Sequence, residues 1–455
     1  MTPSASSRTF AVRRRCACGP ACAPWRCRSV SPARWLPAGL QGCAALPARH
    51  RRFPDRRAGR GNLRLLRRRP GQRGRRGGGE RSAAPRRSPG IRRRYERRAG
   101  RFRVHFPLRN DTGFEMNEMT KIETTLKDWE TDQEVRWCPG CGDYAILNAI
   151  QKTFPELGVA REDFVVVSGI GCSSRFPYYM QTYGFHTVHG RAPTVATGVK
   201  VARPELSVWM ITGDGDGLSI GGNHLLHVLR RNPDINILLF NNRVYGLTKG
   251  QYSPTSNVGM KTKSTPMGSI DHPVNPIQFA IGAEASFIAR TVDTDPKHMV
   301  ETFKAAQAHK GTSFVEVFQN CVIFNNKTFD PVTGRDVRND QVMFLEEGKP
   351  LVYGEGRTKG IRLNGLNMET VDLAEGASTD DLVVHNPKDP NPAYATLLAQ
   401  MTYPTFPTPL GILRQLEGRE TYEESVVGQI ESAQSKGEGL LQELLTGNNS
   451  WVVEG

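Results

Sequence analysis

The sequence predicts an α/β fold in which helices cover both faces of a parallel sheet. Segments with strand and helix patterns alternate between about residues 143 and 321. The strand segments are continuous apolar runs, as in sheets that are buried on both faces. Successive strand segments also end in Gly, Cys, Asp or Asn. Because ligands of such sheets bind beyond the carboxyl ends of the strands, we expect the functional site at that edge.

The first elements follow from the spacing of apolar residues. Behind a CPGC turn, apolar side chains recur at helical spacing from Tyr144 to Phe154, which predicts a helix. The runs DFVVVSGIGC (163–172), LSVWMITGDGDG (206–217) and INILLFNN (235–242) predict buried strands that end in Gly-rich or polar turns. Helices are expected between them, over 193–205 and over 221–234, where Asn232-Pro233 closes the second helix.

The later elements are less regular. We expect helices over 276–290 and 295–311 and a strand over 312–321 (TSFVEVFQNC). From residue 346 the alternation weakens, so a Pro-rich extended arm over 385–411 and a terminal helix over 424–447 are predicted. This gives one domain over 116–345 and a C-terminal arm and helix over 346–455.

The basic charge of the chain is confined to its first quarter. Residues 1–110 contain 31 Arg, no Lys and three acidic residues, a net charge of +28, whereas residues 111–455 carry −12. The total of +16 therefore does not indicate a polyanion binder. We expect residues 1–115 to be a disordered Arg-rich segment, and a non-native extension ahead of a start at Met116 or Met119. A transit peptide and an RNA-binding arm are the alternatives.

Polar residues follow two strand segments that are separated by one helix. Asp214 lies in GDG after the first strand, and Asn242 follows the second, 28 positions later. A β-α-β unit brings both to the same edge. One carboxylate, one amide and a nearby backbone carbonyl suit Mg²⁺ with phosphate oxygens, and an EF-hand fits poorly because the rest of its loop is missing. A lone GDG is usually only a tight turn, but with this spacing and a following helix it indicates thiamine diphosphate.

Four cysteines remain outside the Arg-rich segment. Cys138 and Cys141 form CPGC, while Cys172 and Cys321 each end a strand segment. By count alone, four thiolates suit Zn²⁺ and a [4Fe–4S] cluster equally, and Cys172 and Cys321 could instead be buried apolar residues. The position of Cys172 in the Gly-rich turn beside the thiamine site favours the redox cluster.

With these motifs, the chain resembles the beta subunit of 2-oxoacid:ferredoxin oxidoreductases. Its details are most similar to the 2-oxoglutarate type, which is also called 2-oxoglutarate synthase. The resemblance is strong over about 120–345, weaker to the end, and absent over 1–115. It rests on the late Cys321 and on the segments CPGCGDYAIL, SGIGCSSR, HGRAPTVATGVK, GDGDGLSIGGNHLLHVLRRN and NNRVYGLTKGQYSPTS.

The resemblance implies binding residues for three cofactors. Mg²⁺ would be held by Asp214, Asn242 and the carbonyl of Val244. Lys249 would lie near a substrate carboxylate, with a solvated charge as the alternative, and His224 and His227 would only pack or meet solvent. The [4Fe–4S] cluster would be held by Cys138, Cys141, Cys172 and Cys321. Thiamine diphosphate would be contacted by Ile170, Gly171, Cys172, Ser173, His189, Gly215, Asp216, Gly246 and Leu247.

The implied reaction is oxidative decarboxylation of 2-oxoglutarate with coenzyme A to succinyl-CoA and CO₂, with electrons passing through the cluster to ferredoxin. Pyruvate is the alternative substrate, and the physiological direction stays open. Because only one thiamine-type domain is present, an alpha subunit should supply the glutamate that faces the aminopyrimidine ring, in a heterotetramer.

The sequence argues against two other classes of protein. The four cysteines speak against a thiamine-dependent decarboxylase or synthase without redox chemistry, and the charge distribution speaks against a zinc-ribbon nucleic-acid-binding protein. No run of about 18 apolar residues indicates a membrane span. We therefore expect a cytoplasmic enzyme without nucleic-acid or membrane partners.

Overall fold

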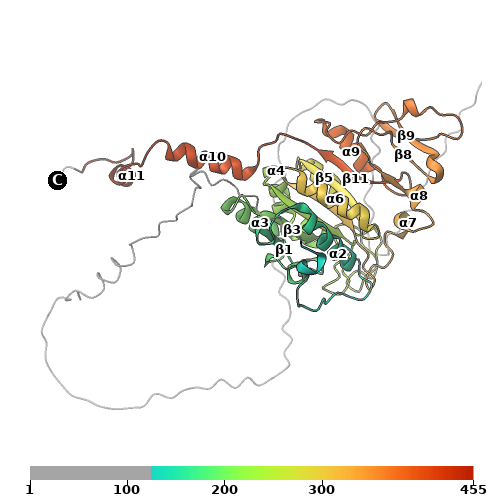
Figure 1. Cartoon of the computed structure of the whole chain (residues 1–455), viewed down its shortest axis with the longest axis horizontal. Coiled ribbons are helices and arrows are strands. Elements are labelled where there is room, and N and C mark those ends of the chain that lie inside the picture. Colours follow the sequence, from blue (N-terminus) through green and yellow to red (C-terminus); the bar gives the residue numbers. More distant parts are fainter. Residues whose placement is uncertain (1–123, 454–455) are drawn as a thin grey trace, which may run out of the picture. The chain divides into compact units, whose positions relative to one another are not determined.

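A mostly parallel, eight-stranded sheet forms the centre of the fold, which confirms the predicted class. The computed structural model describes residues 124–453, and the Arg-rich segment predicted over 1–115 lies outside them. The strand order is β2-β1-β3-β4-β6-β5-β11-β7, and only β11 runs antiparallel to its neighbour β5. Figure 1 labels β1, β3, β5 and β11 of this sheet. The strands are β1 (Phe164–Ser168), β2 (Tyr183–His186), β3 (Ser207–Gly213), β4 (Ile235–Asn241), β5 (Phe287–Val292), β6 (Ser313–Phe318), β7 (Val342–Phe344) and β11 (Thr408–Gln415).

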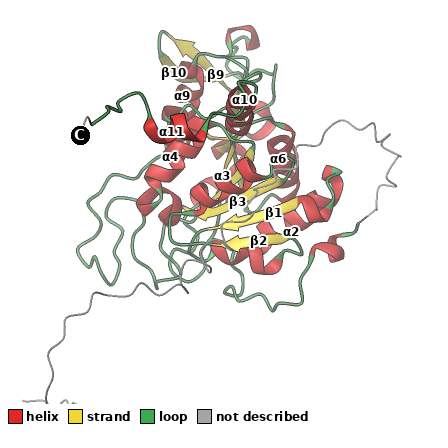
Figure 2. Cartoon of the chain, turned by 90° about the vertical axis from the view of Figure 1, so that its left-hand side faces the viewer, coloured by secondary structure: helices red, strands yellow, loops and turns green. Residues whose placement is uncertain are grey.

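Helices cover both faces of this sheet (Figure 2). Alternate residues of β1 explain why: Val165 and Val167 pack in one buried cluster, while Phe164 and Val166 pack in the other. The first cluster holds α3 (Ala192–Ala202), α4 (Gly222–Arg231), α5 (Pro276–Gly282) and α9 (Pro392–Gln400). The second holds α2 (Asp143–Thr153) and α6 (Pro296–Ala308). Burial of both faces is what the continuous apolar runs in the sequence predicted.

The C-terminal region departs from the prediction. Instead of an extended arm, residues 385–411 contain α9 and the beginning of β11, which enters the main sheet beside β5. The helix expected over 276–290 stops at Gly282, and Phe287–Val292 form the buried strand β5. The short apolar run after Gly282 suits helix and strand equally, and the partner strands decide between them.

Several smaller elements complete the fold. A three-stranded antiparallel sheet consists of β8 (Val352–Tyr353), β9 (Lys359–Asn364) and β10 (Asn367–Asp372). Two short helices, α7 (Asp330–Thr333) and α8 (Arg338–Gln341), precede β7. The predicted terminal helix is divided into α10 (Tyr422–Gln434) and α11 (Leu441–Thr446), because the residues between them include Gly437 in the left-handed region at φ 82°.

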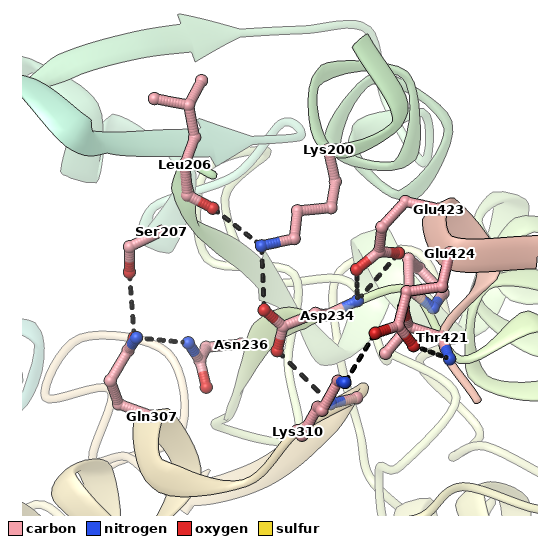
Figure 3. Close-up of polar contacts among 12 residues, drawn as sticks. Lys200, Leu206, Ser207, Asp234, Asn236, Gln307, Lys310, Thr421, Glu423 and Glu424 are labelled. Carbon is pink, nitrogen blue, oxygen red and sulfur yellow. Dashed lines mark hydrogen bonds and ion pairs between the residues drawn. The ribbon is translucent and has the colours of Figure 1, made fainter. Parts of the chain in front are cut away.

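Hydrogen bonds attach α10 to the amino-end side of the sheet (Figure 3). The carboxylate of Glu423 accepts from the backbone N–H of Asp234 at 3.2 Å, immediately before β4. Lys200 of α3, which is 4% exposed, donates to Asp234 at 2.8 Å and to the carbonyl of Leu206 at 2.9 Å. Glu424 pairs with Lys310. This edge is held by structural contacts, which leaves the opposite, carboxyl edge for chemistry.

Candidate active site

A cavity of about 210 Å³ lies at the carboxyl edge of the sheet. It opens between the turn after β1, the turn after β3 and the loop after β4, where parallel α/β sheets bind their ligands. All of the residues predicted to contact thiamine diphosphate or Mg²⁺ line this one cavity. They are Ile170, Gly171, Cys172, Ser173, His189, Asp214, Gly215, Asp216, Asn242, Val244, Gly246 and Leu247.

Asp214 is one of two buried carboxylates that line the cavity, with 2% of its surface exposed. Its Oδ2 accepts hydrogen bonds from the hydroxyls of Ser253 and Thr255, each at 2.5 Å. Burial raises the pKa of Asp214 to about 6, although these hydrogen bonds oppose the shift. Asn242 shapes the loop, because its Oδ1 accepts from the backbone N–H of Val244 at 3.1 Å. The donor set around this point is therefore made of oxygens, which hard cations prefer.

Asp216 connects three loops rather than facing the cavity freely. Its Oδ1 accepts from the backbone N–H groups of Ile170 (3.0 Å) and Gly190 (2.7 Å), and Oδ1 lies 2.7 Å from Nδ1 of His189. The other oxygen, Oδ2, accepts from Thr212 Oγ1 at 2.7 Å. Asp216 thus fixes the imidazole of His189 and the turn after β1, a role that the sequence pattern did not reveal.

The four cysteines approach one another beside the cavity. A Cβ added to Gly246 would lie 3.4 Å from Cys172 Sγ and 3.7 Å from Cys321 Sγ, so both sulfurs border the same small space. Burial raises the pKa of the Cys141 thiol, and nearby Asp143, Cys172 and Cys321 raise it further. Burial likewise raises the pKa of Cys172 to about 12, with contributions from Asp143, Cys321 and Cys138. All four are free cysteines.

The CPGC turn is fixed from two directions. Gly142 N–H donates to the carbonyl of Asn320 at 3.1 Å, which ties the turn to the residue before Cys321. The indole N–H of Trp137 donates to the carbonyl of Cys172 at 2.7 Å. Gln319 Nε2 lies 3.2 Å from Cys141 Sγ. The segments that carry the cysteines are therefore joined by hydrogen bonds, although they are distant in sequence.

Lys249 lies outside the cavity lining. It is exposed, and its backbone has a positive φ of 78°, which is uncommon for a residue other than Gly. Its neighbour Thr248 does line the cavity, as does Tyr245, whose hydroxyl donates to the carbonyl of Gly215 at 3.0 Å. The sequence analysis did not predict Tyr245 as a site residue, although it stands between the predicted residues Val244 and Gly246. Lys249 is thus a rim residue of the loop that closes the cavity.

Two features are absent from residues 124–453. No three side chains of the His, Cys, Asp and Glu types stand close enough together there to form a ready-made site for one metal ion. Within the same residues, no helix combines the length and the apolar character needed to cross a membrane.

The sheet and its cavity define a thiamine-diphosphate-binding domain. Residues 169–317 match the family model described as the thiamine pyrophosphate enzyme C-terminal TPP-binding domain. This match begins in the turn after β1 and ends in β6, so it spans the loops that line the cavity.

Comparison with known proteins narrows the class. The chain is 50% identical over 332 residues to 2-oxoglutarate oxidoreductase subunit KorB of Mycobacterium tuberculosis, covering 72% of this chain and 88% of that protein. It is 49% identical over 201 residues to the beta subunit of 2-oxoacid:ferredoxin oxidoreductase 1 of Aeropyrum pernix, covering 44% and 63%. A solved 2-oxoglutarate:ferredoxin oxidoreductase from Magnetococcus marinus matches with 32% identity and a TM-score of 0.57, over 72% of this chain and 96% of that one. The chain belongs to the family of 2-oxoacid:ferredoxin oxidoreductase beta subunits.

Proposed function

We propose that this chain is the beta subunit of a 2-oxoglutarate:ferredoxin oxidoreductase. The enzyme converts 2-oxoglutarate and coenzyme A to succinyl-CoA and CO₂, and passes two electrons singly to ferredoxin. The relative from Mycobacterium tuberculosis carries 2-oxoglutarate in its name, and the solved Magnetococcus marinus enzyme holds 2-oxoglutarate, coenzyme A and succinyl-CoA. One observation carries the proposal: Cys172 lines the cavity of Asp214 and Asn242 and also borders the space beside Cys321.

The oxygen donors fit a magnesium diphosphate. Asp214, Asn242 and the carbonyl of Val244 would hold Mg²⁺, while His189, fixed by Asp216, and Tyr245, held against Gly215, would bound the thiamine diphosphate. When bound, thiamine diphosphate supplies the electron sink for decarboxylation, and an iron–sulfur cluster supplies single-electron transfer. Lys249, on the exposed rim, would meet a carboxylate of the substrate.

The cysteines fit a four-iron cluster better than a zinc ion. Each thiolate of such a cluster binds a different iron, so its ligands stand farther apart than those around one ion. The cysteines lie near enough to one another to raise the pKa values of Cys141 and Cys172. They are nevertheless too far apart to form, within residues 124–453, a group of three ligands around a single ion. We assign Cys138, Cys141, Cys172 and Cys321 as the ligands.

A second subunit would complete the site. The cavity holds about 210 Å³, less than the roughly 300–1,000 Å³ of sites that enclose a drug-sized ligand. Apolar side chains stand exposed near its rim, among them Val188 (70%), Ile220 (55%) and Leu247 (45%). We infer that an alpha subunit covers this face and supplies the glutamate that contacts the aminopyrimidine ring of thiamine diphosphate. The two subunits would form a cytoplasmic heterotetramer to which ferredoxin binds transiently.

The decisive test is anaerobic co-expression with the alpha subunit, followed by a viologen-reduction assay with coenzyme A. We expect a brown complex that reduces viologen with 2-oxoglutarate and far more slowly with pyruvate. Cys321→Ser should lose the cluster absorbance, and Asp214→Asn should lose thiamine diphosphate binding while it keeps the cluster. The exposed acid Asp271 is the matched control, and Asp271→Asn should change neither.

Two results would contradict parts of the proposal separately. A colourless protein that binds stoichiometric zinc would refute the redox assignment. A brown complex with a preference for pyruvate would keep the family but replace the substrate.

A further inference from the structure

A second cavity of about 460 Å³ lies at the same sheet edge, on the other side of the β4 loop. Two arginines line it, Arg243 from the loop after β4 and Arg290 from β5. Much of the remaining wall is apolar, with Val274, Phe329 and Val332 among the lining residues. None of the predicted cofactor or metal ligands lines this cavity, so the proposed activity gives it no task.

The cavity carries more positive than negative charge. Arg290 is 3% exposed, and its Nε donates to Glu316 Oε2 at 2.7 Å. The other oxygen of Glu316 is already occupied, because it accepts from Asn241 Nδ2 at 2.7 Å. Arg243 has only a long bond to the amide of Asn257, at 3.3 Å, and within residues 124–453 it forms no ion pair. Within the part of the chain that the structure describes, Glu316 is the only carboxylate that lines the cavity, although Asp214 of the neighbouring cavity also lies near enough to Arg243 to act on its charge. The terminal nitrogens of Arg290 have no hydrogen bond within residues 124–453.

Aromatic stacking holds both arginines in place. Phe318 and Phe329 stack with ring centroids 4.1 Å apart and an interplanar angle of 9°. Arg243 lies 4.6 Å from the centroid of the Phe329 ring, and Arg290 lies 5.2 Å from that of Phe318. A guanidinium that stacks on a ring keeps its N–H donors in the plane around its edge, where they suit the oxygens of a carboxylate or phosphate.

We propose that this cavity binds an organic anion, with its carboxylate or phosphate at Arg243 and Arg290 and its apolar body along Val274 and Val332. The volume is within the usual range for small-molecule sites, which combine apolar walls with a few convergent polar groups. Within residues 124–453 Arg243 forms no ion pair and Arg290 leaves its terminal nitrogens without a hydrogen bond, so an anion would supply the acceptor that these donors lack. The inference goes beyond the proposed activity and does not rest on it.

Calorimetric titration of the purified full chain, free and in its complex, tests the site with benzoate, phenyl phosphate and neutral benzamide. We expect one saturable site for at least one anion, and the better of the two probes identifies the preferred head group. Benzamide should bind at least about tenfold more weakly, because it lacks the charge that completes the guanidinium pair.

Two variants and a control separate charge from shape. Arg243→Gln and Val274→Trp, which narrows the half-exposed wall, should each weaken anion binding at least about tenfold. Arg230→Gln removes an exposed arginine of α4 and should leave it unchanged. Absence of anion binding in both preparations, equal binding of benzamide, or undiminished binding by Arg243→Gln would each overturn the proposal. Circular dichroism of each variant shows that a loss of binding is not a loss of fold.

Discussion

At the scale of the residue, the two aspartates of GDGDG have different tasks. Asp214 keeps one carboxylate oxygen for two hydroxyl groups and lines the cavity, whereas both oxygens of Asp216 are occupied by Thr212, Ile170, His189 and Gly190. The sequence places both residues at one strand end, but it does not show which carboxylate is used for hydrogen bonds within the protein. That division depends on the backbone N–H groups of loops 26 and 46 positions away.

Substitution of Asp216 should therefore damage structure before chemistry. In Asp216→Ala, the buried N–H of Gly190 and the partly buried N–H of Ile170 lose their acceptor, and loss of the acceptor of a buried donor costs about 1–3 kcal/mol. We expect a lower midpoint of urea unfolding together with weaker thiamine diphosphate binding. Asp216→Asn keeps one acceptor oxygen, so its unfolding midpoint should lie between those of the parent chain and Asp216→Ala. An unchanged unfolding midpoint in the alanine variant would contradict the structural role.

Asp143 provides a test of burial at the cysteine turn. It is 1% exposed, and neither carboxylate oxygen has a hydrogen-bond partner within residues 124–453. Burial raises the pKa of Asp143 to about 7, so the folded chain retains a proton that the unfolded chain releases. The free energy of unfolding should then fall as pH rises from about 4 to about 7.

Asp143→Asn should remove this dependence. At pH 8 we expect the cluster-free variant to be more stable than the parent chain by on the order of a few kcal/mol, and at pH 4 we expect equal stability. Urea unfolding under reducing conditions at both pH values measures the difference. Glu162→Gln, at an exposed position, is the control, and an equal gain from it would show that the effect is not one of burial.

At the scale of the element, α10 is held to the core by its first turn. Lys310 beside Glu424 lowers the pKa of that carboxyl to about 2, assisted by the backbone N–H of Thr421. Because the folded-state pKa is lowered, this contribution is present above the ordinary value near 4.5 and is lost as pH falls toward 2. We expect Glu424→Gln to speed hydrogen exchange of the α10 amides severalfold at neutral pH. Glu431→Gln, farther along the same helix, should leave the exchange unchanged.

Sequence reasoning predicted four strands of the core, assigned the equally buried β5 to a helix, and missed the strands that depend on distant partners. β1, β3, β4 and β6 are buried on both faces, so their apolar runs identified them. β2 is exposed along its whole length and forms the edge of the sheet, and β11 pairs with segments far away in the sequence. The loops that line the cavity were predicted because they follow buried strands, whereas Tyr245 and the hydroxyls around Asp214 depend on how the long loop folds back.

At the scale of the whole molecule, the basic charge and the cavity lie in different parts of the sequence. The site described above is built entirely from residues of the part that carries −12, while residues 1–110 carry +28. A chain that starts at Met116 should therefore bind thiamine diphosphate as the full chain does, but should elute from heparin at much lower salt. Isothermal titration and a salt gradient check the two statements. Weaker cofactor binding by the shorter chain would show that the first segment contributes to the site.

The burial of Asp214 has a consequence for how variants of this protein would survive selection. A carboxylate whose pKa is raised to about 6 by burial is held at a cost in folding free energy, so a neutral residue there should accumulate in cells as well as the parent does. Asp216 is the opposite case, because its loss leaves backbone N–H groups without an acceptor, whereas the hydroxyls that donate to Asp214 also have each other and Asn241 Oδ1 within reach. In a library sorted first by abundance and then by activity, substitutions at Asp216 should disappear at the first sort and those at Asp214 only at the second.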